Sequence, residues 1–378
     1  MLRPFRIGVQ NVDDDPYDIT KTLAATAQAL TPQWEIPSTG YLNAIYILVE
    51  NVVTSSTATA TGTAGVGVLK EDGPYCAIAS ITFTDTNSSE IIGPITGWDL
   101  YVINKWGGYC FQDDPEANTD LFSATTNATA SSSASGSFSF MLRIPVELVP
   151  RDALGSLPNK SSSTPFKVKI TLADIASIYN ASTTVGGSCR VRMFSDSYWE
   201  PTKVDGSGNP IQGDPPAVNT TQYWNKTDYT VTAGSMSETL TNSTGFPVRH
   251  LGFILRDSNL SRLQGESDFP NPFVLQLQSN IMLNRGPKLW KRKITEDYGY
   301  GAAGDSTNQK DNGLYWQAYC KDFYPKPGWE TRRGYLRTTD GMRLQMKGTI
   351  TGSGVHTMTV LTNFVGMGPG TSLAQVTT

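Results

Sequence analysis

The chain has 378 residues, more than one hydrophobic core usually supports, so we expect two domains of roughly 150–200 residues each. Charged residues make up only 17% of the sequence, and the abundance of Ser, Thr, Gly and Asn is typical of β-rich proteins with many turns. The net charge of −4 argues against a protein that neutralises nucleic acid, and no apolar run is long enough to cross a bilayer. No apolar stretch follows the basic residues at positions 1–6, so no secretory signal is predicted.

The first predicted element covers residues 19–30, and its type stays open. Ile19, Leu23, Ala27 and Leu30 recur at helical spacing, and Asp18 could cap such a helix. The same stretch is rich in Thr, which favours a strand. Both alternatives are retained for this segment.

Two apolar runs follow nearly the same turn sequence. Ser38–Tyr41 (STGY) precedes Ile45–Val49, and Ser243–Phe246 (STGF) precedes Leu251–Leu255. In each copy, a small-residue turn and an aromatic residue lead into a strand that is too apolar to face water on both sides. An internal repeat of this kind indicates that each half of the chain is one packing unit.

Alternation of apolar and polar residues predicts half-buried strands through most of the chain. The longest alternating run covers Phe138–Leu148, where Pro145 implies an edge position or a bend. The same pattern recurs at residues 167–172, 190–193, 342–347 and 356–361. The sequence therefore predicts an all-β protein with few short helices.

The Pro- and Gly-rich stretch Glu200–Gln222 is the best candidate for a domain boundary. The low-complexity tracts Thr54–Gly65 and Ser123–Ser137 are expected to form exposed loops. The predicted organisation is a first β domain with an N-terminal arm at 1–199, a connection at 200–222, a second β domain at 223–364 and a flexible tail at 365–378.

No catalytic, cofactor or metal site is predicted. The two histidines, His250 and His356, lie in or beside apolar runs, which favours packed or surface histidines. The four cysteines are widely spaced and contain no Cys-x-x-Cys pair, so we expect buried reduced thiols. Asp13–Asp15 could bind a hard cation, but a solvated acidic turn before Pro16 is the simpler interpretation.

Two clusters that combine cations with aromatic rings are candidate contact surfaces. Alternating aromatic and basic residues could contact an anionic lipid surface or a nucleic-acid backbone, although a solvated face is the usual alternative. The stronger cluster consists of Lys288, Trp290, Lys291, Arg292 and Lys293. The shorter cluster consists of Arg3, Phe5 and Arg6.

Three groups of strand-and-turn stretches, spread over most of the chain, carry a resemblance to a known family. They are Ile81–Asp85 with Gly93–Asn104 (GPITGWDLYVIN), Phe140–Asn159 (FMLRIPVELVPRDALGSLPN) with Phe166–Leu172, and Gly334–Gly341 (GYLRTTDG) with Val360–Asn363. With these patterns the chain resembles the double jelly-roll major capsid proteins of tectivirus-like bacteriophages. These phages are tailless and contain a membrane.

The resemblance implies two eight-stranded jelly-roll β-sandwiches in each chain and a homotrimeric, pseudo-hexagonal capsomer in an icosahedral shell. The implied partners are neighbouring copies, the minor capsid, vertex and membrane proteins of the virion, and the lipid of an internal membrane. Neither enzymatic activity nor specific nucleic-acid recognition is expected. The protein would be made in the host cytoplasm and reside in the virion, with Arg3, Phe5 and Arg6 near the membrane at the inner face of the shell.

Two other classes stay open. A secreted or surface-displayed β-sandwich binding protein, such as an adhesin or a glycan-binding module, would share the Ser/Thr/Asn-rich composition. A β-sandwich hydrolase would need a cleft with perturbed carboxylates, for which Asp113, Asp114 and Glu116 are the first candidates.

Overall fold

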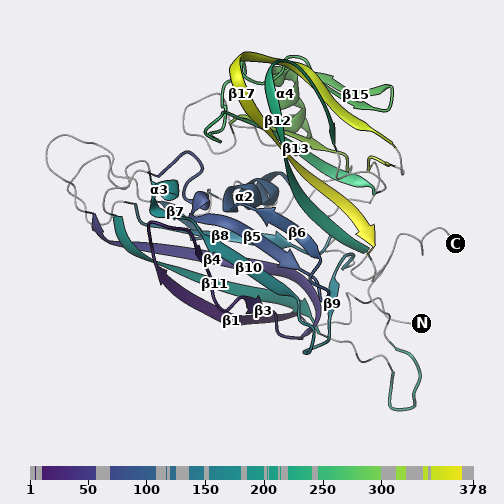
Figure 1. Ribbon diagram of the computed structural model, residues 1–378. Helices are drawn as coiled ribbons and strands as arrows, with labels where there is room; N and C mark the ends of the chain where they lie inside the picture. The colour runs from purple at the N-terminus through teal and green to yellow at the C-terminus, as the bar shows by residue number, and fades with distance from the viewer. Residues whose placement is uncertain are drawn as a thin grey trace. The chain divides into compact units, whose positions relative to one another are not determined.

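A computed structural model of the chain divides into two compact units (Figure 1). The first unit comprises residues 1–105, 113–222 and 367–378, and the second comprises residues 106–112 and 223–366. The residues that the structure describes are 5, 11–56, 69–107, 116, 120–124, 136–148, 153–179, 185–199, 202, 204–211, 213, 220–240, 246–298, 312–320, 335–338 and 342–367.

Strands predominate in the first unit. Its strands are β1 (Asn11–Thr22), β2 (Gln28–Ala29), β3 (Trp34–Glu35), β4 (Gly40–Ser56), β5 (Ile78–Thr84), β6 (Glu90–Ile95), β7 (Phe122–Ala124), β8 (Phe138–Pro145), β9 (Leu157–Asn159), β10 (Lys167–Leu172) and β11 (Val185–Tyr198). The helical elements are η1 (Tyr75–Ala77), α2 (Gly97–Trp106) and α3 (Ile175–Ile178).

The strands of the first unit form two antiparallel sets. One sheet has the order β1, β11, β4, β8, β7, with β9 also pairing with β4 (Figure 1). In the other set, β10 pairs with β5 on one side and with the short β2 and β3 on the other, and β6 pairs with β5. Alternate residues of β10 (Val168, Ile170 and Leu172) are buried, as period-two patterning requires.

Aromatic packing joins elements of the first unit that are distant in sequence. The ring of Tyr75 in η1 stacks on Tyr101 of α2 at 4.4 Å between centroids and meets Phe140 of β8 edge-on at 5.0 Å. All three side chains are almost completely buried. Such pairs add to the apolar area that they remove from water, so this cluster is a centre of the core of the unit.

Residues 19–30 contain strands and no helix. β1 continues to Thr22, where Ile19 lies opposite Val191, and Gln28–Ala29 form β2. Asp13–Asp15 belong to β1 as well, so the expected acidic turn is instead a strand with a register shift between Asp14 and Tyr17. The helical spacing was misleading because pairing with β11, which is more than 160 residues distant, decides the conformation.

Pro145 ends β8, which lies between β4 and β7. β7 pairs only with residues 138–140 of β8, so among the described residues no strand pairs with Pro145 on the side away from β4, which agrees with the predicted edge position. Proline has no backbone N–H to donate to the ladder, which accounts for the end of β8 at this residue.

Two long neighbouring strands, β12 (Thr220–Leu240) and β17 (Leu344–Met367), run through the second unit. Its other elements are β13 (Val248–Arg256), β14 (Phe273–Leu277), β15 (Asn280–Arg285), α4 (Pro287–Tyr298) and β16 (Leu314–Ala318). The first part of β17 pairs with β14, and residues 357–364 of β17 pair with β13. Between these parts, a Cβ added at Gly348 would lie 2.6 Å from Cβ of Pro270, so glycine is required there.

The two apolar runs of the repeat form strands that are hydrogen-bonded to a neighbouring strand along each edge. β4 lies between β11 and β8, and β13 lies between β16 and β17. Every residue of β13 is buried. Both strands confirm the expectation that these runs do not face water on both sides.

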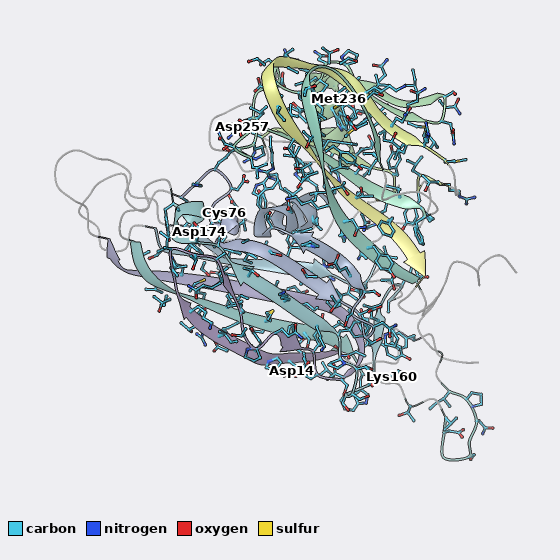
Figure 2. All side chains as sticks on the ribbon, in the orientation of Figure 1. Asp14, Cys76, Lys160, Asp174, Met236 and Asp257 are labelled. Carbon is cyan, nitrogen blue, oxygen red and sulfur yellow. The ribbon has the colours of Figure 1, made fainter. Side chains whose placement is uncertain are left out.

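The two units also share a hairpin turn that the repeat did not reveal. The Asp85 carboxylate accepts hydrogen bonds from the backbone N–H groups of Asn87 and Ser89 at 2.8 and 2.7 Å. The Asp257 carboxylate (Figure 2) accepts from those of Asn259 and Ser261 at 2.8 and 2.9 Å. The fourth residue of each turn has a left-handed backbone, with φ of 65° at Ser88 and 63° at Leu260.

Candidate interaction surfaces

The basic run at 288–293 lies in helix α4, which turns Trp290 inward. Trp290 has no exposed surface, and its Nε1 donates a hydrogen bond to the backbone oxygen of Trp316 at 2.6 Å. Ile294, four residues later on the same helical face, is buried too. The prediction that Trp290 is part of an exposed basic-aromatic surface is therefore wrong, because its indole belongs to the core of the second unit.

The cations of the same helix are largely balanced by nearby carboxylates. Lys291 pairs with Glu266 at 3.1 Å, while Arg292 and Lys293 both pair with Glu296, at 3.1 and 2.7 Å. Lys293 and then Arg292 lower the pKa of Glu296. The two exposed pairs with Glu296 contribute little to stability, and all three pairs reduce the positive charge available to an anionic partner. A contact role for Lys288, Lys291, Arg292 and Lys293 stays a prediction.

Only one residue of the N-terminal basic cluster can be placed. Phe5 is 3% exposed and packs against Tyr41, Tyr198 and Ala153. It therefore lies in the first unit and does not form an exposed contact. Arg3 and Arg6 lie outside the described residues.

The outward face of the sheet formed by β1, β11, β4 and β8 is more apolar than a solvated sheet face. On β4, Tyr46 and Leu48 are half-buried between the fully buried Ile45, Ile47 and Val49. Cross-strand pairing puts Phe194 of β11 beside Tyr46 and Met141 of β8 beside Leu48. We call the set Tyr46, Leu48, Met141, Arg192 and Phe194 the outer face.

Charged groups hold the outer face in a defined arrangement. Arg192 lies 5.0 Å above the Phe194 ring and forms an ion pair with Asp15 at 2.5 Å. Asp18 accepts a hydrogen bond from Nε of Arg190 at 2.8 Å and a second from its guanidinium, which lowers the pKa of Asp18. Aromatic and arginine side chains are enriched at protein–protein interfaces, so this flat, mixed surface suits association with another protein.

The outer face was not predicted from the sequence, although the pattern of apolar residues in β4 indicates it. The run Ile45–Val49 is apolar at both odd and even positions. A strand with one solvated face should alternate. Apolar residues on both faces thus indicate a second covered surface, and the structure shows which residues form it.

The histidine and cysteine side chains are packed groups. His250 is fully buried, accepts a hydrogen bond at Nδ1 from Nε1 of Trp316 at 3.3 Å, and has Nε2 3.5 Å from Sγ of Cys320. Burial and then Arg249 place the pKa of His250 well below its ordinary value. Cys189 and Cys320 are buried, and burial raises the pKa of Cys189 to about 12. Cys76 is half-buried, whereas Cys110 lies outside the described residues.

Other chemical candidates remain without a site. Asp113 and Asp114 lie outside the described residues, and Glu116 is half-buried. In the part of the chain that the structure describes, no three His, Cys, Asp or Glu residues are grouped so that they could hold a metal ion. Among the described helices, none combines the length and apolarity needed to span a membrane.

Comparison with known proteins finds similarity in fold. No family model and no curated protein matches the sequence. The major capsid protein P2 from bacteriophage PM2 aligns over 96% of this chain and 100% of its own, with a TM-score of 0.55 and 8% identity.

Two further structures align over similar lengths. For the atomic structure of Sulfolobus turreted icosahedral virus, the TM-score is 0.61 at 10% identity, over 96% of this chain and 91% of the other. For the PBCV-1 virus capsid, the TM-score is 0.56 at 8% identity, over 96% of both chains. These neighbours are double jelly-roll capsid proteins, so the all-β, double jelly-roll fold expected from the sequence is confirmed.

Proposed function

We propose that this chain is a major capsid protein that associates with copies of itself to build an icosahedral virion shell. The full-length likeness in fold carries the proposal: it extends over 96% of this chain and 100% of the PM2 protein. A double jelly roll does not by itself define a function. The alignments with the PM2, Sulfolobus virus and PBCV-1 structures each extend over both units of this chain, which favours a role that uses both.

The outer face supports self-association. Tyr46, Leu48 and Phe194 form a half-buried apolar strip on one face of the sheet, with Arg192 and its ion pair beside it. Covering such a strip removes apolar area from water. A protein that repeats one contact with closed symmetry needs a surface of this kind on every copy.

The proposal extends to the assembly that such a chain would build. Three chains would form a pseudo-hexagonal homotrimer, because the two similar units of each chain supply six positions of nearly equal shape. Trimers would contact neighbouring capsomers and the minor capsid, vertex and membrane proteins of a tectivirus-like bacteriophage virion. The shell would enclose an internal membrane, and the chain would be made in the host cytoplasm.

Electron microscopy of the purified protein, with one surface variant and one control, tests this function. Wild type should give particles with a pseudo-hexagonal outline. Leu48→Lys should remain folded but lose these particles, because an uncompensated ammonium group would be buried at the contact. Val204→Lys changes an exposed residue (49% exposed) of the connection and should assemble normally.

Two results would contradict the proposal. One is a folded wild-type protein that stays as isolated single chains at every concentration tested. The other is Leu48→Lys particles that are indistinguishable from wild type, which would remove the outer face from the contact. Saturable binding of a glycan by isolated chains would instead support the binding-module alternative.

A further inference from the structure

Phe5 fills a socket whose walls come from three distant parts of the first unit. Tyr41 of β4 and Tyr198 of β11 lie opposite each other in the sheet, and Ala153 comes from the segment before β9. The Phe5 ring meets Tyr41 at 5.2 Å and 77°, and meets Tyr198 at 5.7 Å and 88°. Edge-to-face geometry with two rings is a favourable arrangement for aromatic side chains, so the socket fits an aromatic ring.

The walls of the socket are fixed independently of Phe5. The Tyr198 hydroxyl donates to Oε2 of the buried Glu147 at 2.8 Å, and Glu147 is 3.5 Å from the Arg143 guanidinium. Lys160, at the end of the unit near β9 (Figure 2), places its ammonium group 4.5 Å from the centre of the Tyr41 ring. A socket whose walls are held by their own partners keeps its shape when the ring leaves.

β1, the strand that follows Phe5, pairs with β11 from Asn11 onward and carries an unfavourable pair of side chains near its start. Asp13 of β1 lies directly opposite Asp196 of β11, so two carboxyl groups meet across the strands. Asn43 of β4, Arg143 of β8 and the carboxyl group of Asp13 all interact with Asp196, and burial is the main cause of its raised pKa. Like charges directly opposite each other are destabilising. Further along β1, opposite charges pair instead, as in Asp18 with Arg190.

We propose that the Phe5 socket is an exchangeable binding site, which accepts Phe5 from the N-terminal segment of a second copy of this chain. The socket shows which side chain it fits, because its own occupant is an aromatic ring from that segment. The like-charged Asp13–Asp196 pair lowers the cost of releasing the first part of β1 together with Phe5. The inference does not depend on the proposed capsid function, since any association of two copies would permit it.

Photo-cross-linking between two isotopically distinct chains tests the exchange. The donor is the full chain with a photoreactive phenylalanine analogue in place of Phe5. The acceptor is the full, ¹⁵N-labelled chain carrying Phe5→Ala, so that its socket is empty. After mixing and illumination, mass spectrometry identifies cross-links from donor position 5 to labelled peptides that contain Tyr41 or Tyr198.

We expect donor–acceptor cross-links at the socket, at a yield at least about tenfold higher than with a labelled wild-type acceptor whose socket is filled, given the free energy of burying one aromatic ring. A donor with the analogue at Trp199, which is 59% exposed, measures cross-linking that arises from proximity alone. If Phe5→Ala fails to fold, Phe5→Leu serves as the acceptor, because it keeps an apolar group without a ring.

Cross-links confined to the donor's own socket, at every ratio of donor to acceptor, would overturn the exchange. Cross-links that avoid Tyr41 and Tyr198 altogether would overturn the socket itself. Equal yields with the Phe5→Ala and wild-type acceptors would also overturn the proposal, because they would mean that an empty socket gives no advantage.

Discussion

At the scale of single residues, His250 couples the second unit to pH. It lies between Trp224, stacked at 5.9 Å, and Cys320, in a site with no exposed surface. Because Nδ1 accepts a hydrogen bond from Trp316, the proton of the neutral ring is on Nε2 and faces Cys320. The side chain is thus a bridge between two buried groups, and protonation would break the bond at Nδ1.

The stability of the protein should therefore fall in mild acid. The folded state holds His250 neutral with a pKa well below 6.5, whereas the unfolded chain takes up a proton near that pH. Stability is lost as pH falls below about 6.5, with a limiting slope of about 1.4 kcal/mol per pH unit for one group. Urea unfolding between pH 7 and pH 5 should show a flatter dependence for His250→Phe than for wild type. Parallel curves would contradict this assignment.

Asp196 should have the opposite pH dependence. Its folded pKa is raised, first by burial and then by neighbours that include Asp13, so the folded state binds this proton more tightly than the unfolded chain does. The contribution of this bound proton to the stability of the folded state is present at low pH and is lost as pH rises through the folded pKa of Asp196. Asp196→Asn should raise the Tm at pH 7, with a gain that shrinks towards pH 4.

Asp18→Asn is the matched control on the same pair of strands. Arg190 lowers the pKa of Asp18, so removing this carboxylate should lower the Tm at pH 7. If Asp196→Asn lowers the Tm at pH 7, or changes it equally at both pH values, the like-charged pair is not the cause.

At the scale of elements, the shared hairpin turn makes a prediction for Asp257 and Leu260. Asp257→Ala removes the acceptor of two backbone N–H groups and should cost about 1–2 kcal/mol, at about 1 kcal/mol for each bond. Leu260→Gly should stabilise by about 1 kcal/mol, because Leu260 is 61% exposed and has a left-handed φ of 63° that glycine adopts without strain.

A third turn with the same hydrogen bonds supports the choice of glycine. In the connection, Asp205 accepts from Ser207 and Asn209 at 2.9 and 2.8 Å, and the left-handed position is already Gly208. Chemical denaturation measures each change in the free energy of unfolding. A Leu260→Gly variant that is less stable than wild type would show that the exposed leucine packs against something in solution.

The strands could be predicted from the sequence, because period-two alternation and paired apolar runs act over short distances. Residues 167–172 form β10 with alternate burial, as their pattern indicates. The basic run was less predictable: its cations obscured the i, i+4 spacing of Trp290 and Ile294, the only sign of a buried helical face. Phe5 could not be placed at all, because its burial depends on Tyr41, Ala153 and Tyr198, which only the fold brings together.

At the scale of the whole molecule, the proposed self-association rests on the likeness in fold and on the outer face. Alternation of apolar and polar residues predicted an all-β protein, and the resemblance to double jelly-roll capsid proteins implied the double jelly roll. The full-length likeness confirms that fold. The sequence did not identify the outer face, because only the pairing of β4 with β11 and β8 brings Phe194, Arg192 and Met141 beside Tyr46 and Leu48.

The solution mass of the purified protein, measured by light scattering, tests directly whether copies of the chain associate. If three copies form the proposed closed, symmetric capsomer, we expect a stable species of three times the 41.1 kDa chain. The mass should stay constant on dilution, because an obligate interface dissociates only at very low concentration. A folded species with the mass of one chain at every concentration would contradict the proposed self-association.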